Sequence, residues 1–232
     1  MAALDAWLIE NEKQLLEGRG AIVDVGYGES PVTTLELARA LRSSGRNLRV
    51  IGIEREAQPR PGDEVELLSG DFNTCAQLGP TAVVRAMNVL RGYREEEVPA
   101  IHAALGAGLV EGGLVIEGST DTDGHVTVVW LLRKLTGGLA REALLFHTDF
   151  ERGFSPWLFR DWLPRDLRRR AQPGTAIHSL LSRWDAQATG ATPQERFVRS
   201  VPGVLSATDW EMGHGFARCP APLVRGEAGE MG

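Results

Sequence analysis

The stretch that decides the fold of this chain reads Ala21-Ile22-Val23-Asp24-Val25-Gly26-Tyr27-Gly28-Glu29-Ser30-Pro31. Residues 21–25 form an apolar run interrupted only by Asp24, a pattern typical of a buried β-strand. The next glycines allow a tight turn and a close approach of a ligand to the main chain. Ser30 suits the N-cap of a helix, and Pro31 suits its first position. The stretch therefore predicts a strand, a glycine turn and a helix start, which together are typical of a nucleotide-type site.

The positions of two carboxylates support this interpretation of a nucleotide-type site. Asp24 lies two residues before Gly26, and Glu54 ends the next apolar run, residues 48–54. A carboxylate at that strand end can accept both hydroxyls of a ribose. A dinucleotide-dependent dehydrogenase would need a third glycine near residues 31–32, which the sequence lacks. A strand–helix turn without any ligand is the alternative.

The order Asp24-x-Gly26-x-Gly28 followed by Glu54 resembles the class I S-adenosylmethionine-dependent methyltransferases. The resemblance implies that the first acid and the glycine turn surround the methionine part of the cofactor, and that Glu54 holds its ribose. Gly70-Asp71-Phe72, after a predicted strand at 65–69, resembles the family's adenine-contacting corner, with a simple Gly-Asp turn as the alternative. The implied cofactor-binding residues are Asp24, Gly26, Tyr27, Gly28, Glu54, Asp71, Phe72 and Asn88.

Asn88 ends a fourth predicted strand, residues 81–88, and ligands of open α/β sheets bind at such strand ends. We expect it to act as a positioning residue, because methyl transfer from a sulfonium needs alignment and no covalent side chain. The Asn/Asp-Pro-Pro-aromatic motif of amino-group methyltransferases is absent, so their amine-orienting role is not carried over. Other polar groups that could lie near the site are Glu117, His147 and His178.

Composition sets the broad class of the protein. The chain has 232 residues, 43% of them hydrophobic, and a net charge of −6. These values are those of an ordinary globular protein and disfavour a nucleic-acid surface over the whole chain. The two cysteines, Cys75 and Cys219, have no metal or redox spacing and are expected to be reduced. Without a signal-like or membrane-spanning apolar run, we expect a cytoplasmic protein with no membrane partner.

The remaining segments predict a Rossmann-like, mostly parallel sheet with antiparallel edge strands. We expect helices at 4–16 and 98–109, a fifth strand at 114–117 opened by Gly112-Gly113, and returning strands at 126–132 and 143–147. Arg85, inside an apolar strand, is expected to pair with Asp24 or another buried acid, and the alternative is a ligand carboxylate. Asp121, Asp123 and His125 could be imagined as metal ligands, but turn chemistry explains them, and we predict no metal.

The character of the chain changes at Ser155. We predict a SAM-binding domain at 1–154 and a C-terminal helical cap on the substrate side at 155–225, with helices near 177–184 and 193–201. Its aromatic residues are interpreted as cap packing, and its arginines at 165–170 as a solvated face or an anion contact. The tail from 226 to 232 is expected to be disordered.

The sequence therefore predicts methyl transfer from S-adenosylmethionine (SAM) to an unidentified small or medium acceptor. Three alternatives remain open: a SAM-binding regulatory protein without turnover, an RNA methyltransferase whose arginines meet phosphates, and a nicotinamide-dependent oxidoreductase. A small-molecule partner is favoured over RNA. The sequence does not indicate the oligomeric state.

Overall fold

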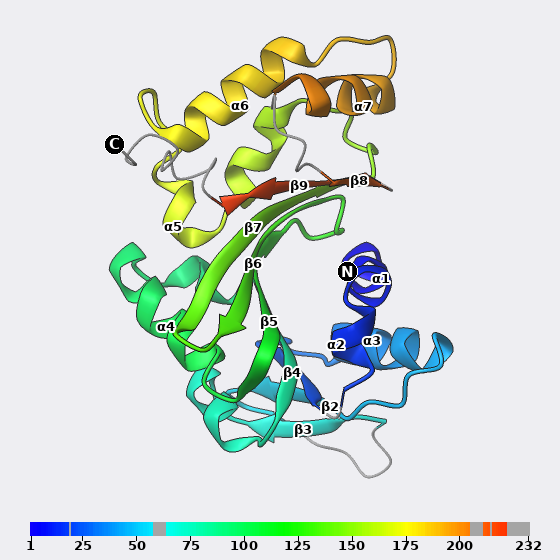
Figure 1. Ribbon diagram of the computed structural model, residues 1–232, viewed down its shortest axis with the longest axis vertical. Helices are drawn as coiled ribbons and strands as arrows, with labels where there is room; N and C mark the ends of the chain where they lie inside the picture. Colours follow the sequence, from blue (N-terminus) through cyan, green and yellow to red (C-terminus); the bar gives the residue numbers. More distant parts are fainter. Residues whose placement is uncertain (19, 58–63, 205–210, 214, 222–232) are drawn as a thin grey trace. The chain divides into compact units, whose positions relative to one another are not determined.

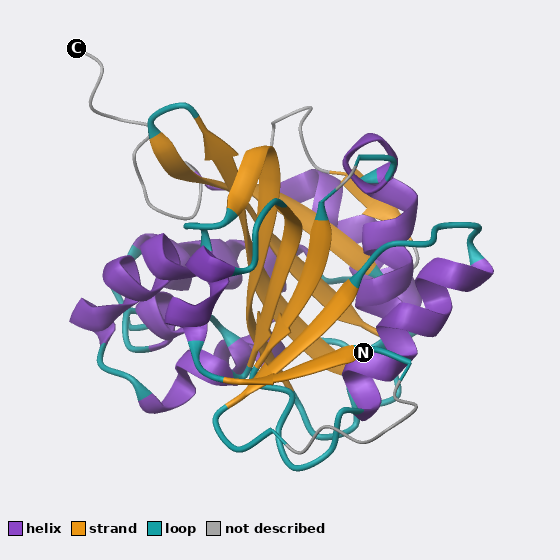
Figure 2. Cartoon of the chain, turned by 90° about the horizontal axis from the view of Figure 1, so that it is seen from below, coloured by secondary structure: helices purple, strands orange, loops and turns teal. Residues whose placement is uncertain are grey.

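The computed structural model describes residues 1–232 except for 19, 58–63, 205–210, 214 and 222–232. It is a mixed α/β structure of helices and strands (Figure 2). Two compact units can be distinguished. The first comprises Met1–Val89, Glu97–Glu117 and Leu132–Ala140, and the second comprises Leu90–Glu96, Gly118–Leu131 and Arg141–Gly232.

Within the described residues the strands form one sheet with the order β3-β2-β1-β4-β5-β6-β7-β9-β8. Their bounds are β1 Ala21–Val25, β2 Val50–Glu54, β3 Glu66–Ser69, β4 Thr81–Met87, β5 Leu109–Thr120, β6 Val126–Leu135, β7 Gly138–Thr148, β8 Glu211–Gly213 and β9 Phe216–Pro220. β1 pairs in parallel with β2 and β4, and β2 pairs in parallel with β3. β5, β6 and β7 are neighbours joined by short turns, so they run antiparallel, and β9 pairs antiparallel with β7. The predicted fold class is confirmed.

The first unit holds the parallel strands. Most of their apolar side chains are buried, as expected for strands covered on both faces, and Ile22, Ile51 and Val83 are fully buried. Figure 1 shows α1 (Ala2–Asn11), α2 (Lys13–Leu16) and α3 (Val32–Ser43) on one side of these strands, with α4 (Val98–Leu105) on the other. The amphipathic α3 buries Leu37, Ala38 and Leu41 against the sheet.

Several element boundaries differ from the predictions. The N-terminal helix breaks at Glu12, where the backbone leaves helical geometry, and α3 begins at Val32 with Pro31 as its N-cap. The helix predicted at 98–109 ends at Leu105, because the chain turns at Gly106 and β5 starts at Leu109. Gly112-Gly113 therefore lies inside a strand. Pro59 and Pro61, which lie between β2 and β3 in the sequence, fall outside the described residues.

The second unit is built around an aromatic core. It contains the 3₁₀ helix η4 (Pro156–Trp162), α5 (Arg165–Arg168), α6 (Ala176–Gln187) and α7 (Pro193–Val204). Phe159 and Trp184 are fully buried and stack with ring centroids 5.5 Å apart. The indole of Trp184 donates a hydrogen bond to Ser200 Oγ at 2.8 Å. Core packing thus explains the buried aromatic residues of this region.

The segment 155–225, predicted to be a helical cap, also contains the strands β8 and β9. β9 pairs with β7, so that Ala217 lies opposite Phe146, and β8 pairs with β9. The boundary between the two units also runs through β5, β6 and β7 and not at residue 154. The functional division at 154/155 stays a prediction. Among the described helices, none combines the length and apolar character needed to cross a bilayer.

Candidate functional site

The carboxyl ends of four parallel strands meet at one edge of the first unit. The register pairs Val25 with Ile53 and with Ala86, and it pairs Glu54 with Ser69. The chain therefore leaves β1, β2, β3 and β4 along the same edge. The strand order reverses between β1 and β4, and ligands of open α/β sheets bind at such a switch point.

The turn after β1 needs both of its glycines. Gly26 and Gly28 have φ values of +73° and +82°, which L side chains rarely adopt. A Cβ atom on Gly26 would lie 2.6 Å from Cγ2 of Val89, so this glycine also serves packing. A Cβ on Gly28 would meet no heavy atom within 4 Å. Gly28 therefore presents its main chain to open space.

Glu54 is held in place by the main chain around it. One carboxylate oxygen, Oε2, accepts the N–H of Gly28 at 2.9 Å, and Oε1 accepts the N–H of Arg55 at 2.8 Å. A carboxylate has about four acceptor positions, so each oxygen can still accept a hydroxyl of a ligand. The half-buried Glu54 thus links the end of β2 to the glycine turn and keeps acceptor capacity.

A cavity of about 660 Å³ lies beside this link, and we call it the glycine-turn pocket. It is lined by the turn and the start of α3, by the end of β2 and by β3; the lining residues are Tyr27, Gly28, Glu29, Ser30, Pro31, Leu35, Glu54, Arg55, Glu56 and Leu67. Its volume is in the range of small-molecule sites. Three carboxylates and one guanidinium line it, so the pocket favours cationic and hydroxyl-bearing ligands.

Asp24 is engaged inside the protein. Its carboxylate accepts two hydrogen bonds from Arg85, both at 2.8 Å, and one from Thr34 at 2.6 Å. Arg85 also pairs with Asp5 of α1. Burial by itself lowers the pKa of Arg85, but the charges and hydrogen bonds of Asp24 and Asp5 outweigh it and raise the pKa above its ordinary value. The structural interpretation of Arg85 is confirmed, and Asp24 does not line the pocket.

Asp71, Phe72 and Asn88 also follow strand ends but do not line the pocket. Asp71 caps the 3₁₀ helix η1 (Phe72–Gln77), because its side chain accepts the N–H of Asn73 at 2.8 Å. The turn alternative explains Asp71 without a ligand, so its adenine contact stays a prediction. The exposed Asn88 has a φ of +61° directly after β4. Such a conformation is unusual for a residue other than glycine and is enriched at functional sites.

The other predicted polar candidates have local partners. Glu117 lies 3.1 Å from His102 Nε2, and both residues are buried in the first unit. In the second unit, His147 stacks on Phe216, and burial lowers its pKa to about 4. His178 lies edge-on to Trp157. None of these three candidates lines the glycine-turn pocket.

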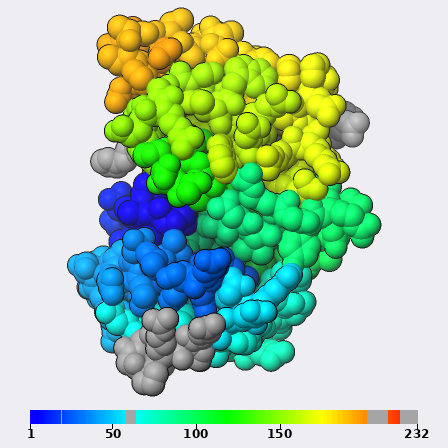
Figure 3. Space-filling model, turned by 180° about the vertical axis from the view of Figure 1, so that it is seen from behind, coloured from blue at the N-terminus to red at the C-terminus, as the bar shows by residue number. Residues whose placement is uncertain are grey.

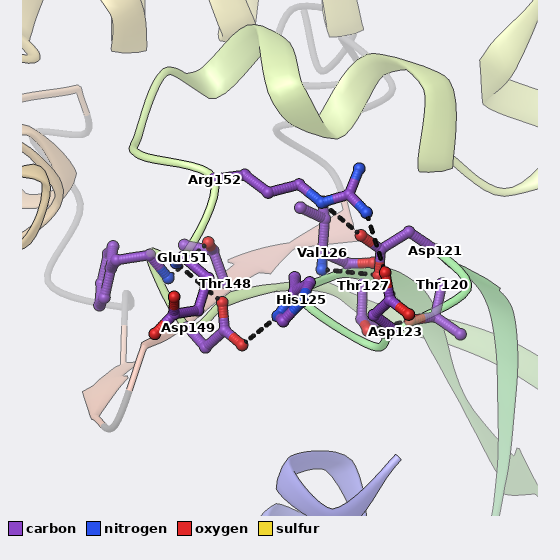
Figure 4. A network of polar contacts seen from close by, with 11 residues as sticks. Thr120, Asp121, Asp123, His125, Val126, Thr127, Thr148, Asp149, Glu151 and Arg152 are labelled. Carbon is purple, nitrogen blue, oxygen red and sulfur yellow. Dashed lines mark hydrogen bonds and ion pairs between the residues drawn. The ribbon is translucent and has the colours of Figure 1, made fainter.

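The hairpin between β5 and β6 forms a polar network in the second unit (Figure 4). Arg152 contacts Asp121 at 3.1 Å and Asp123 at 3.3 Å, and His125 Nδ1 lies 2.6 Å from Asp149 Oδ2. The turn interpretation of these residues is therefore supported. In the part of the chain that the structure describes, no group of three or more His, Cys, Asp or Glu side chains is arranged to hold a metal ion.

Sequence reasoning missed part of the pocket lining. Arg55 and Glu56 follow Glu54 directly, and their place after a strand end was the available signal. Leu35 and Leu67 carried only helix and strand periodicity, which does not distinguish a pocket wall from the core. Glu29 also lines the pocket, and it lies within the glycine turn itself.

No protein-family model matches this chain, and no curated protein matches it. Solved structures with a similar arrangement include a LepI variant in complex with SAH and a substrate analogue, at 15% identity and TM-score 0.40, covering 47% of this chain and 30% of that one. Magnesium protoporphyrin IX methyltransferase (ChlM) from Synechocystis PCC 6803 with bound SAH shows 22% identity and TM-score 0.38, covering 52% and 54%. A putative protein-L-isoaspartate O-methyltransferase from Plasmodium falciparum with S-adenosyl-L-homocysteine shows 19% identity and TM-score 0.38, covering 60% and 67%. This chain thus spans about half or less of the first two proteins. At these values the likenesses support no functional conclusion.

Proposed function

We propose that the glycine-turn pocket binds SAM and that the protein transfers its methyl group to a small or medium acceptor. The observation that carries the proposal is the Glu54 carboxylate, fixed by the N–H groups of Gly28 and Arg55 at the carboxyl end of β2. A carboxylate in this place is suited to the two hydroxyls of a ribose. The open space at Gly28 lets a ligand approach the main chain beside it.

The charge of the pocket supports SAM over a dinucleotide. Glu29, Glu54 and Glu56 outnumber the single guanidinium of Arg55. SAM carries a sulfonium and an ammonium group against one carboxylate, so this lining attracts it. The pyrophosphate of a nicotinamide dinucleotide would be repelled, and the third glycine of its usual turn is absent.

The residues of this chain would act by binding and orientation. When bound, the sulfonium of SAM supplies a methyl group that is already reactive. Glu54 would hold the ribose, the turn at 26–28 would accommodate the methionine part, and Asp71 with Phe72 would receive the adenine. Asn88 is proposed as the positioning residue, because it directly follows the carboxyl end of β4 and has an unusual φ of +61°. Aligning the reacting groups contributes much of the rate enhancement in such a mechanism.

The role of residues 155–225 as a substrate-side region is part of the same proposal.

A SAM-binding regulatory protein without turnover would bind SAM equally well and would produce no S-adenosylhomocysteine. An RNA methyltransferase would retain RNA with a steep dependence on salt concentration.

The test begins with the purified protein. Mass spectrometry of the heat-released ligand is expected to find SAM or S-adenosylhomocysteine, and calorimetry is expected to show saturable binding of both compounds but not of NAD⁺ or NADP⁺. Incubation with methyl-labelled SAM and fractionated small-molecule extract should then transfer the label. Binding of a nicotinamide dinucleotide in place of SAM would contradict the proposal. Binding without any labelled product would favour the regulatory alternative.

A further inference from the structure

Within the second unit, residues 90–96 contact residues 160–170 at three points. The Arg91 guanidinium lies over the Trp162 ring, 4.6 Å from its centroid. Arg165 donates a hydrogen bond to the carbonyl oxygen of Tyr93, and Arg170 donates one to Glu95 at 2.6 Å. Figure 3 shows the surface of residues 155–170 in yellow-green and yellow on the face that it draws. The two segments therefore form one basic surface.

The arginines of this surface differ in the partners that their guanidinium groups contact. The carbonyl of Tyr93 receives Arg165, and Glu95 neutralises Arg170. In the described part of the chain, neither Arg91 nor Arg168 makes a hydrogen bond or an ion pair with a carboxylate. Among the described residues, Arg160 and Arg169 also lack a carboxylate partner, but both are exposed. Arg91 and Arg168 are therefore the half-buried arginines of this surface whose side chains have no hydrogen-bonding partner among the described residues.

The charge of Arg168 also acts on Arg91. Burial lowers the pKa of Arg91, and the like charge of Arg168 lowers it further, against a smaller opposing effect of Asp161. Two guanidinium groups that repel each other in a half-buried place are stabilised by an anion that contacts both.

The stacking on Trp162 prepares Arg91 for such a contact. A guanidinium that lies over an aromatic ring uses its face and leaves the N–H groups in its plane available. Those N–H groups match the two oxygens of a carboxylate or phosphate. The ring also restricts the Arg91 side chain, so less conformational entropy is lost when an anion binds.

We propose that Arg91, held on Trp162, and Arg168 form a binding site for the oxyanion of a small molecule, a carboxylate or a phosphate group. This site goes beyond methyl transfer, and its existence does not depend on SAM binding. A small ligand fits better than RNA, because the site offers two cations beside Asp161 and Glu95 on a chain of net charge −6.

The test uses the full chain without SAM. The indole N–H signals of the tryptophans are recorded by NMR, and the Trp162 signal is assigned from the Trp162→Phe variant. Sodium phosphate or sodium acetate is then titrated in, with sodium chloride balancing the ionic strength. We expect a saturable shift of the Trp162 signal with at least one of the two anions. The stronger anion identifies the group that the site prefers.

Three variants decide whether the two named arginines are responsible. Arg91→Gln and Arg168→Gln should each weaken anion binding at least about tenfold, as expected for loss of a charge-assisted hydrogen bond. Arg169→Gln removes the same charge from an exposed neighbouring position and should change the affinity less than about twofold. Unchanged spectra of the apo variants verify their fold.

Three results would overturn the proposal. One is the absence of a saturable shift with both anions. Another is equal weakening by Arg169→Gln and Arg91→Gln, which would indicate general attraction by a basic face. The third is tight binding of a single-stranded RNA oligomer that Arg169→Gln weakens as much as Arg168→Gln, because RNA would then be the ligand of this surface.

Discussion

Replacing Arg85 by methionine should destabilise the protein more than any exposed charge change in the first unit. Arg85 is 1% exposed and donates hydrogen bonds to both oxygens of Asp24, to Asp5 and to the carbonyl oxygen of Thr33. It ties β4 to β1, α1 and the first turn of α3. Methionine would fill the space but leave two buried carboxylates without a cation.

The expected loss follows from those partners. Breaking a buried ion pair by removing one member costs about 3–5 kcal/mol. In a chain of this length each kcal/mol corresponds to roughly 2–4 °C, so the midpoint of thermal unfolding should fall by about 6–20 °C. The control is Arg39→Met on α3, because Arg39 pairs with Glu64 at 3.3 Å while its side chain is 60% exposed. Pairs of that kind contribute about 0–1 kcal/mol.

Urea unfolding of the wild type and both variants measures these differences, and pH provides a second check. Burial is the largest influence on Asp5 and already raises its pKa, although Arg85 opposes the shift. Without Arg85 this pKa should rise further above the unfolded value. A group with a raised folded pKa gains stability as the pH falls, so the deficit of Arg85→Met should shrink between pH 8 and pH 5. A deficit no larger than that of Arg39→Met, or one that grows as the pH falls, would refute the reasoning.

Three further predictions concern the turn, the hairpin and the aromatic core. Gly28→Val should abolish SAM binding, whereas Gly45→Val, which has the same φ of +82° and equally open surroundings outside the pocket, should bind normally; calorimetry compares them, and equal affinities would place Gly28 outside the site. The hydrogen bond with Asp149 raises the pKa of His125, so the stability that this pair contributes should be complete below about pH 6.5 and lost as the pH rises through the raised pKa. An NMR titration midpoint for His125 at or below 6.5 would contradict this. Trp184→Ala should lower the free energy of unfolding by about 3–5 kcal/mol, because it empties a fully buried position, and urea unfolding should show a smaller loss for the half-buried Trp157→Ala.

Sequence patterns predicted the elements whose signals are local. The continuous apolar runs of β1, β2 and β4 and the periodicity of α3 predicted the parallel sheet and its glycine turn. Arg85 was expected to pair with Asp24, since a lone cation in an apolar strand needs an anion. Its second partner, Asp5, could not be foreseen, because it lies on a helix 80 positions earlier in the chain.

The differences between the predictions and the structure have physical causes as well. β9 is short and holds no β-branched residue, so its pairing with β7 rests on tertiary contacts that a local pattern does not reveal. α4 ends early because Gly106 closes it, although Leu109 continues the apolar spacing into β5. In the sequence, an aspartate that contacts a ligand and one that stabilises the fold look the same at position 24. The hydrogen bonds that Asp24 accepts from Arg85 and Thr34 show that it stabilises the fold.

The most direct test of the central claim is the affinity of SAM for Glu54→Ala, measured by calorimetry. Hydrogen bonds to a charged group contribute about 1.5–3 kcal/mol, so the dissociation constant should rise roughly 10- to 150-fold. Glu36→Ala removes an exposed carboxylate of α3 that does not line the pocket, and it should bind SAM like the wild type. Wild-type affinity in a folded Glu54→Ala protein would contradict the claim that Glu54 holds the cofactor.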